Sequence, residues 1–253
     1  MANTVISVKN LVKNYGSFKA VKGISFDVYE GEIFGLLGPN GAGKSTTLEI
    51  IETLRTKTGG EVVVCGLNLD KEPDSIKKII GVQLQTSGFY PGLTLMELIH
   101  LFGGLYNQPV NPLELLKIVN LSDKAKNKYK EMSGGQKQRF SIATTLINKP
   151  KIIFLDEPTT GLDPQARRNL WELIKNIRSQ GTTVIITTHY MDEAEQLCDR
   201  IAIMDEGKII SLDSPDKMID DLVQSGFERP KQVKAASLED VFIHLTGKEM
   251  RDE

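Results

Sequence analysis

A glycine-rich loop between a strand-like run and a helical run constrains this chain more than any other feature. The apolar segment EIFGLL leads directly into GPNGAGKST, and a helical run follows. Gly38, Gly43, Lys44 and Ser45 fit the pattern G-x-x-x-x-G-K-[ST] in the required order of strand, loop and helix. The sequence therefore predicts a phosphate-binding loop at the end of a buried strand.

The residue types in this loop match the chemistry of a nucleoside triphosphate. Glycines let the backbone curl so that several N–H groups point at phosphate oxygens. Lys44 is expected to reach the β- and γ-phosphates, and the hydroxyl of Ser45 is expected to bind Mg²⁺. The whole loop is predicted to contact the nucleotide: Gly38, Pro39, Asn40, Gly41, Ala42, Gly43, Lys44, Ser45 and Thr46.

Two further strand-like runs end in residues suited to the same reaction. The run KIIFLD ends in Asp156, and Glu157 follows it. Asp156 is placed to hold Mg²⁺ through water, and Glu157 to orient or deprotonate an attacking water. His189 ends the run TTVIITTH, and ligands bind at the carboxyl edge of a parallel sheet. We therefore predict that Glu157, His189 and Lys44 are catalytic.

The run EMSGGQKQRF offers a second place for an anion. Ser133 and Gln136 form the capping-box pattern, so a helix is expected to begin here. A free helix N-terminus presents unpaired N–H groups and the positive end of the helix dipole. One chain thus carries two predicted anion sites that lie far apart in the sequence.

The order of the remaining patterns predicts a mixture of strands and helices. Rough alternation of β-branched residues in TVISVKNLVKNYG and KGISFDVYEGE indicates strands. Helical spacing from about residue 93 to 147 indicates a helical insertion. A helical pattern over residues 164–181 separates KIIFLD from TTVIITTH, which is the order of a parallel sheet. IAIMDEGKII predicts a hairpin.

Composition limits the remaining possibilities. The chain has 253 residues and a formal net charge of −2, which opposes a general nucleic-acid binder. Cys65 and Cys198 have no metal-type spacing, so a reducing compartment is expected. The N-terminus lacks the pattern of a signal peptide. No stretch approaches the ~18 apolar residues that cross a bilayer, so any membrane role is expected to come through a partner.

Together these motifs resemble those of the ATP-binding cassette (ABC) transporter ATPases over nearly the whole chain. MSGGQ is similar to the family's signature motif, with Met132 where leucine is commoner. Gln85 matches the glutamine of the Q-loop, although Gln83 competes in register, and Asp163 in TGLDP matches the D-loop. Tyr15 stands where the family stacks an aromatic ring on adenine; the alternative is a core aromatic at a strand edge.

The resemblance implies a fold class and a domain organisation. It predicts an α/β P-loop NTPase (RecA-like) core with a parallel sheet, an N-terminal antiparallel β subdomain and a helical insertion subdomain. The ATP-binding domain would span residues 5–235, with the helical subdomain inserted at about 88–147. A short helical tail would span 236–253, where SLEDVFIHLTGK begins with a capping-box-like pattern at Ser237.

The resemblance also gives the second anion site a purpose. In the family, two cassettes face head to tail, and the signature helix of one contacts the γ-phosphate bound to the other. Ser133, Gly135, Gln136 and Asp163 would thus serve ATP held by a second ATP-binding subunit, with a homodimer expected. The Mg²⁺ ligands that the resemblance implies are Ser45, Gln85 and Asp156.

The helical insertion is expected to dock on an integral membrane permease, which places the chain peripherally at the cytoplasmic face of the cell membrane. Phe89 and Tyr90 are candidate contacts, or they pack under their own loop. The segments TTGLDPQARRNLWELI, THYMDEAEQLCDRIAIMDEGKII and SLEDVFIHLTG resemble those of export cassettes. Export of a drug-like, lipid or polysaccharide substrate is therefore expected.

Two other functions share the phosphate loop. A soluble ABC-type ATPase that acts on ribosomes or DNA usually carries two cassettes, coiled-coil arms or zinc-binding insertions. This chain has one cassette, no sustained heptads and no CxxC pair. A P-loop kinase or GTPase is opposed by SGGQ and by the Asp156-Glu157 pair. We therefore interpret the chain as the ATPase subunit of an ABC transporter.

Overall fold

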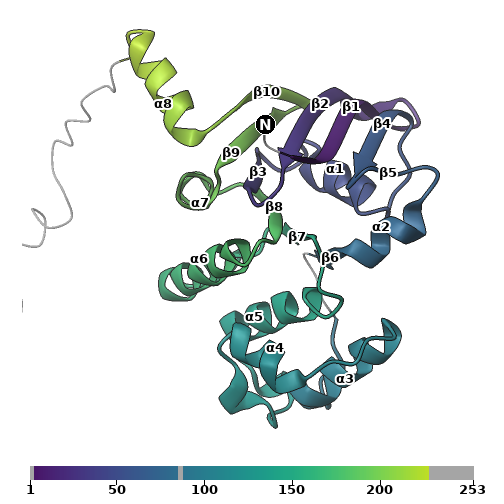
Figure 1. Cartoon of the computed structure of the whole chain (residues 1–253). Helices are drawn as coiled ribbons and strands as arrows, with labels where there is room; N and C mark the ends of the chain where they lie inside the picture. Colours follow the sequence, from purple (N-terminus) through teal and green to yellow (C-terminus); the bar gives the residue numbers. More distant parts are fainter. Residues whose placement is uncertain (1–2, 85–87, 228–253) are drawn as a thin grey trace, which may run out of the picture. The chain divides into compact units, whose positions relative to one another are not determined.

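The computed structural model describes residues 3–84 and 88–227 of the chain. Its contacts divide the chain into two compact units, Met1–Lys217 and Met218–Glu253. Helix α8 (Pro215–Gln224) contains the boundary. The first unit holds two β-sheets and the helices that cover the larger one (Figure 1). It also holds every predicted site residue that the structure describes, so the following paragraphs concern this unit.

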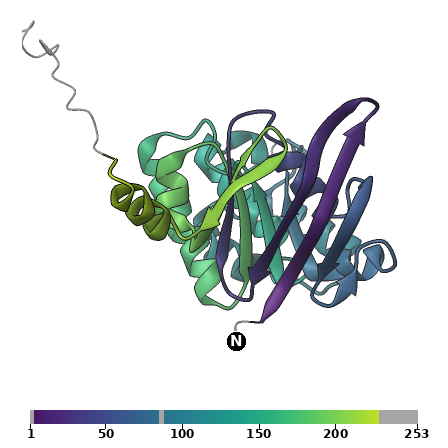
Figure 2. The same cartoon turned by 90° about the horizontal axis from the view of Figure 1, so that it is seen from above.

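The smaller sheet is antiparallel, with the strand order β2-β1-β4-β5. Its long strands β1 and β2 run side by side in Figure 2. Ile6, Val8 and Phe26 are buried because alternate side chains of a half-buried strand face the core. The predicted N-terminal antiparallel sheet is confirmed. Its strands are β1 (Thr4–Tyr15), β2 (Phe18–Tyr29), β4 (Gly59–Val64) and β5 (Leu67–Asn68).

The larger sheet has the strand order β10-β9-β3-β8-β7-β6. The strands from β9 to β6 pair in parallel, as predicted. Strand β10 pairs antiparallel with β9 and closes the predicted hairpin. The strands are β3 (Ile33–Leu37), β6 (Ile80–Gln83), β7 (Ile152–Asp156), β8 (Thr183–Thr188), β9 (Arg200–Asp205) and β10 (Lys208–Asp213).

Helices cover both faces of the larger sheet, so alternate residues of one strand enter two different apolar clusters. On β7, Ile152 and Phe154 pack with α1, whereas Ile153 and Leu155 pack with α5, α6 and α7. This two-sided burial explains the continuous apolar runs in the sequence. The helices are α1 (Lys44–Ile51), α5 (Gly134–Thr145), α6 (Pro164–Ser179) and α7 (Met191–Leu197).

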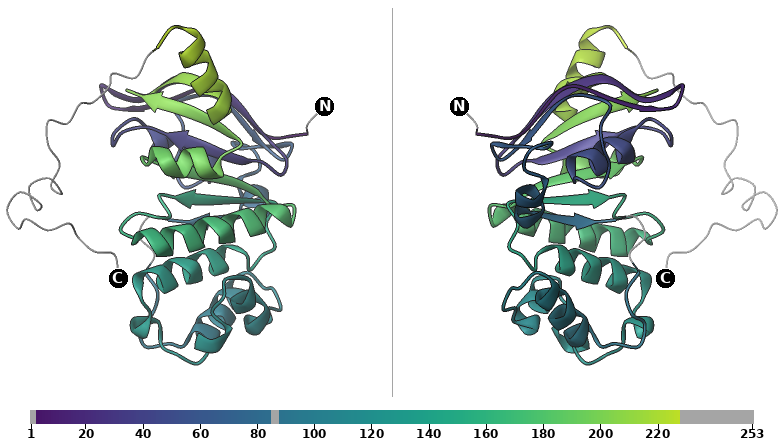
Figure 3. Two further views of the ribbon diagram at one scale, coloured as in Figure 1. Left: turned by 90° about the vertical axis from the view of Figure 1, so that its left-hand side faces the viewer. Right: turned by 90° about the vertical axis from the view of Figure 1, so that its right-hand side faces the viewer.

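The segment between β6 and β7 is helical, as its spacing predicted. It contains α3 (Leu95–Leu105), α4 (Pro112–Ile118), the 3₁₀ turns η1 (Ser122–Lys124) and η2 (Tyr129–Glu131), and α5. Thr94 begins α3 through a capping box with Glu97. In both views of Figure 3, α5 lies between α6 and the pair α3 and α4. The subdomain limits of 88–147 stay a prediction.

Several short elements have no counterpart in the sequence prediction. They include α2 (Pro73–Ile79), which leads directly into the four-residue strand β6, and α7. Elements of four to seven residues are too short to show a clear hydrophobic period. The helix predicted from Ser237 lies outside the described residues. Within 3–84 and 88–227, no helix is long and apolar enough to cross a membrane.

Candidate nucleotide site

The phosphate loop joins β3 to α1 and passes very close to two other strands. A Cβ atom at Gly38 would lie 2.1 Å from the carbonyl oxygen of Met204 on β9. At Gly43, φ is +98°, and a Cβ atom would lie 2.7 Å from the carbonyl oxygen of Ala20 on β2. These approaches leave no room for a larger residue. The two glycines of the motif are therefore required by packing as well as by turn geometry.

Lys44 is the first residue of α1, and its side chain folds back over the loop. Its Nζ donates to the carbonyl oxygens of Gly38 at 2.7 Å and Pro39 at 3.1 Å, and lies 3.8 Å from Oε1 of Glu157. The residue is 4% exposed. Burial lowers the pKa of Lys44, while the carboxylates of Glu157 and Asp156 act against this shift. The loop thus holds a buried cation beside its own carbonyl groups.

Asp156 and Ser45 form a pair of oxygen ligands at the carboxyl end of β7. The Ser45 hydroxyl lies 3.3 Å from Oδ1 of Asp156, and the Thr187 hydroxyl donates to the same oxygen. Burial raises the pKa of Asp156, while both hydroxyls act to lower it. Hydroxyl and carboxylate oxygens suit a hard cation such as Mg²⁺. No cluster of three His, Cys, Asp or Glu residues that could hold a metal ion occurs among the described residues.

Glu157 leaves the strand in an unusual backbone conformation. Its φ is +46°, in the left-handed region, and its N–H donates to the Thr187 hydroxyl at 3.0 Å. A non-glycine residue held there costs about 1–3 kcal/mol, and such residues cluster at functional sites. Oε2 lies 3.3 Å from Nδ1 of His189 and accepts a bond from the Thr160 hydroxyl at 3.3 Å. The turn thus aims Asp156 and Glu157 at different partners.

One cavity of about 550 Å³ collects most of the predicted residues. Tyr15 at its edge is 40% exposed, with the Lys13 Nζ 5.0 Å and the Arg55 guanidinium 5.5 Å from its ring centroid, which rejects the core-aromatic alternative. The sequence motifs did not predict that Phe18, Ala20 and Thr160 line this cavity. An aromatic residue three positions after Tyr15 was the signal that could have indicated Phe18. The cavity is lined by Tyr15, Phe18, Ala20, Asn40, Gly41, Gly43, Lys44, Ser45, Thr46, Glu157, Thr160 and His189.

A second cavity of about 470 Å³ collects Ser133, Gly135, Gln136 and Asp163. The predicted residues Gly38, Pro39, Ala42 and Asp156 line neither cavity. The Ser133 hydroxyl accepts the Gln136 N–H at 3.3 Å, and Oε1 of Gln136 accepts the Ser133 N–H at 2.9 Å, so the capping box is confirmed. Asp163 caps α6 by accepting the Ala166 N–H at 2.8 Å. The lining residues are Ser133, Gly134, Gly135, Gln136, Arg139, Gly161, Leu162, Asp163, Gln165, Ala166 and Asn169. No residue lines both cavities.

The Q-loop prediction can be followed only in part. Gln85 lies outside the described residues. Its competitor Gln83 ends β6, is 2% exposed and lines neither of the two cavities. Gln83 is therefore a buried strand residue.

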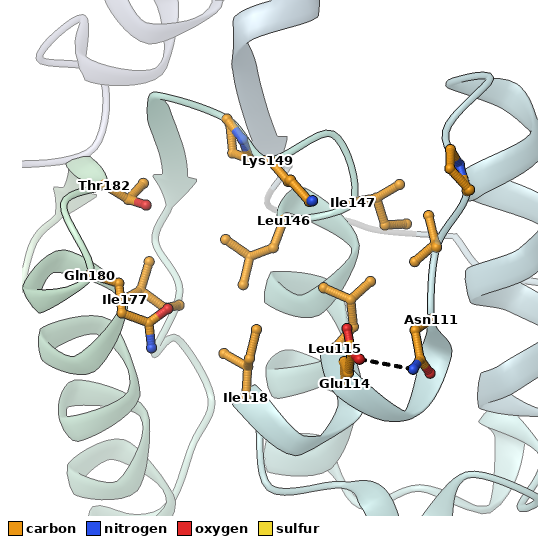
Figure 4. Close-up of a pocket in the computed structure, with 13 residues that line it drawn as sticks. Asn111, Glu114, Leu115, Ile118, Leu146, Ile147, Lys149, Ile177, Gln180 and Thr182 are labelled. Carbon is orange, nitrogen blue, oxygen red and sulfur yellow. Dashed lines mark hydrogen bonds between the residues drawn. The ribbon is translucent and has the colours of Figure 1, made fainter.

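A third cavity, of about 410 Å³, lies away from both sets of residues (Figure 4). Apolar side chains from α4, the end of α5 and α6, including Ile118, Leu146 and Ile177, line most of it. Asn111 donates to Glu114 at 3.0 Å on one side. None of the described predicted site residues lines this cavity.

Comparison with known proteins identifies the family. The ABC transporter family model matches residues 21–160. The linearmycin resistance ATP-binding protein LnrL of Bacillus subtilis is 42% identical over 213 residues, which cover 82% of this chain and 68% of that protein. The Nod factor export ATP-binding protein I of Burkholderia lata is 36% identical over 299 aligned positions, which cover 98% of each chain. A dimeric ATP-binding cassette solved in a post-hydrolysis state with ADP and Pi is 31% identical, with a TM-score of 0.73 and coverage of 83% of this chain and 98% of that one.

The chain therefore belongs to the ABC transporter family, as its motifs predicted. It is the ATP-binding subunit of such a transporter and an ATPase. Cassettes of this family dimerise and partner membrane permease subunits. The kinase, GTPase and ribosome- or DNA-directed alternatives are thereby set aside.

Proposed function

We propose that this chain binds ATP in its first cavity and hydrolyses it together with the second cavity of an identical partner chain. The observation that carries this proposal is the separation of the two sets of residues. Lys44, Glu157 and His189 line one cavity, whereas Ser133 and Asp163 line another. A head-to-tail dimer would place the first cavity of each chain against the second cavity of the other chain, giving two complete sites.

The first cavity supplies most of the binding groups. Lys44 would exchange its two carbonyl partners for oxygens of the β- and γ-phosphates, and the loop N–H groups from Gly41 to Thr46 would surround the same phosphates. The exposed ring of Tyr15 would stack on adenine, which contributes about 1–3 kcal/mol. Lys13 and Arg55 lie over this ring and add positive charge near the nucleotide.

Ser45 and Asp156 would hold Mg²⁺ with the phosphates, and Gln85 is a third candidate ligand. The hydroxyl oxygen of Ser45 and a carboxylate oxygen of Asp156 already lie side by side, which fits such a cation. When bound, Mg²⁺ neutralises charge on the β- and γ-phosphate oxygens. The Thr187 hydroxyl keeps Asp156 turned toward Ser45.

Glu157 would accept a proton from the attacking water or orient it, and His189 would contact the γ-phosphate. The left-handed backbone of Glu157 and its Thr160 contact hold the carboxylate inside the cavity. His189 lies 3.3 Å from the carboxylate, so both groups can contact one water and one phosphate oxygen. Ser133, Gly135 and Gln136 of the partner would bind the γ-phosphate at a helix N-terminus.

The transported substrate and the permease contact are inferred from the relatives and from one exposed residue. Relatives named for linearmycin resistance and Nod factor export favour export of a drug-like or lipid-linked molecule. Phe89 packs against Phe102, Tyr129 and Phe140, which agrees with the alternative that it packs under its own loop. Tyr90 is 67% exposed, so it is the better permease contact. This docking places the chain peripherally at the cytoplasmic face of the membrane.

Replacement of Glu157 tests the hydrolytic role. Glu157→Gln keeps the size of the side chain but removes the base, so ATP should bind while turnover falls at least ~10³-fold, roughly 4 kcal/mol of barrier. The variant should accumulate as an ATP-held dimer in light scattering. Normal turnover, or a strictly monomeric variant in ATP, would refute the proposal.

A further inference from the structure

Glu193 is a buried carboxyl that the nucleotide site does not use directly. It lies in α7, four residues after His189, and is 0% exposed. Its Oε1 accepts a bond of 3.0 Å from the indole Nε1 of Trp171 on α6. Burying a carboxyl is costly unless hydrogen bonds satisfy it. A buried acid in a short helix beside the site therefore calls for an explanation.

The polar neighbours of Glu193 lie on three segments that carry site residues. Burial raises the pKa of Glu193, while the nearby hydroxyls of Thr188 and Thr159 and the Trp171 indole act to lower it. Among the described residues, Oε2 of Glu193 and the Thr159 hydroxyl have no hydrogen-bond partner. Thr188 ends β8 immediately before His189, and Thr159 follows Glu157 by two residues. Trp171 belongs to α6, the helix that Asp163 caps. The carboxyl thus lies close to the two turns that hold the proposed catalytic groups, and its hydrogen bond to Trp171 joins α7 to α6.

A second link runs beside the first, one helical turn earlier on α6. The Arg167 guanidinium lies 3.3 Å from Oδ2 of Asp192 and 4.7 Å from the ring centroid of Tyr190. The Tyr190 ring centroid lies 4.1 Å from that of His189. Arg167 and Trp171 are spaced i and i+4, so both project from one face of α6 toward the His189 turn.

We propose that Glu193 is a positioning residue of the hydrolytic site, which holds the His189 turn in place on α6. This inference rests on the proposed roles of Glu157 and His189. Asp163, Ala166 and Asn169 of the same helix line the second cavity. Glu193 therefore ties a chain's own His189 turn to the helix that serves the partner's nucleotide.

Removal of the carboxyl should affect turnover and leave binding intact. Glu193→Ala is expected to lower kcat about 10- to 100-fold, because small displacements of reacting groups have effects of this size. The Kd for ATP should stay within about twofold, since Glu193 does not line the first cavity. Glu195→Ala, an exposed glutamate of the same helix, is the matched control and should leave both quantities unchanged.

A conservative variant separates positioning by hydrogen bonds from general damage. Glu193→Gln can still accept from Trp171 and can donate to a threonine hydroxyl, so it should keep at least about a third of the wild-type kcat. Trp171→Phe removes only the indole donor and should lower kcat with an unchanged Kd, which covers the case in which Glu193→Ala does not fold. Turnover of Glu193→Ala equal to that of Glu195→Ala, or an equal loss of kcat and ATP affinity, would overturn the inference.

The outcome for Glu157→Gln, measured in the same series, tells the two proposals apart. If Glu157→Gln is inactive while Glu193→Ala and Trp171→Phe turn over normally, the positioning role fails and the proposed function stands. If Glu157→Gln turns over ATP normally, the proposed function fails first.

Discussion

The two half-sites of this chain are built in different ways. The ATP half-site gathers polar side chains from the ends of three strands: Lys44 after β3, Asp156 and Glu157 at the end of β7, and His189 after β8. The signature half-site consists of two neighbouring helix N-termini. Its caps, Ser133 and Asp163, are paired with N–H groups only three residues away.

This difference indicates that the ATP half-site must be assembled before the partner chain binds. Burial moves the pKa values of Lys44 and Asp156, so the ATP half-site carries a desolvation cost that its own contacts offset. The signature half-site uses backbone groups and a helix dipole, which can stay exposed until a partner arrives. Removal of the buried Lys44 cation from the first half should therefore alter ATP affinity, whereas changes in the second half should alter turnover alone.

The largest effect is expected in the signature half-site. Ser133→Arg places a bulky cation at the start of α5, where it should prevent closure on the partner's nucleotide. ATP affinity should be unchanged, whereas turnover should fall at least ~10³-fold. Gln138 on the same helix does not line the second cavity, so Gln138→Arg serves as the control. If Ser133→Arg still hydrolysed ATP, the signature half-site would not be needed for turnover, and the proposed difference between the two half-sites would be wrong.

A smaller effect, in the binding constant, is expected from the ATP half-site. Lys44→Ala removes the buried cation, so the Kd for ATP should rise about 100-fold, the equivalent of roughly 3 kcal/mol. Isothermal titration without hydrolysis measures this directly, with the exposed Lys9 changed to Ala as a control. Unchanged affinity and turnover in Lys44→Ala would refute the assignment of the loop.

The smallest effect is expected in the pH dependence of stability, and it comes from the cost of burying the carboxyl group of Glu52. Glu52 follows α1, is 2% exposed, and burial raises its pKa to about 8, with Asp156 and Glu49 adding to the shift. The folded state therefore binds a proton that the unfolded state has lost above pH ~4.5, so this residue reduces stability as pH rises toward 8. Glu52→Gln should remove this slope, by up to about 1 kcal/mol per pH unit. Denaturant unfolding at pH 5.5 and 8.5 checks it; parallel pH curves for wild type and variant would contradict it.

The same comparison explains how much the sequence could predict. The signature half-site is local, so Ser133 and Gln136 could be recognised as a capping box and were found as one. The loop residues 38–46 are contiguous, and their strand and helix context follows from an apolar run and a motif. The strands β3, β7 and β8 could be predicted because burial on both faces leaves continuous apolar runs.

Contacts between distant segments could not be predicted in this way. The Thr187 hydroxyl that orients Asp156 and the Trp171 indole that holds Glu193 come from strands and helices far along the chain. Phe89 could equally have been an exposed contact, and its packing against Phe102, Tyr129 and Phe140 decides the question. Glu193 did leave a weak signal, because it shares a buried helical face with Ala194 and Leu197.

Mixing two inactive variants tests the shared site most directly. Lys44→Ala is defective in the first cavity and Ser133→Arg in the second, so each homodimer should be nearly inactive when the ATP concentration is close to the wild-type Kd. In a mixed dimer, the intact loop of the Ser133→Arg chain meets the intact signature helix of the Lys44→Ala chain. An equimolar mixture should recover about a quarter of the wild-type rate, because half of the dimers are mixed and each keeps one complete site. A mixture as inactive as its two components would contradict the account.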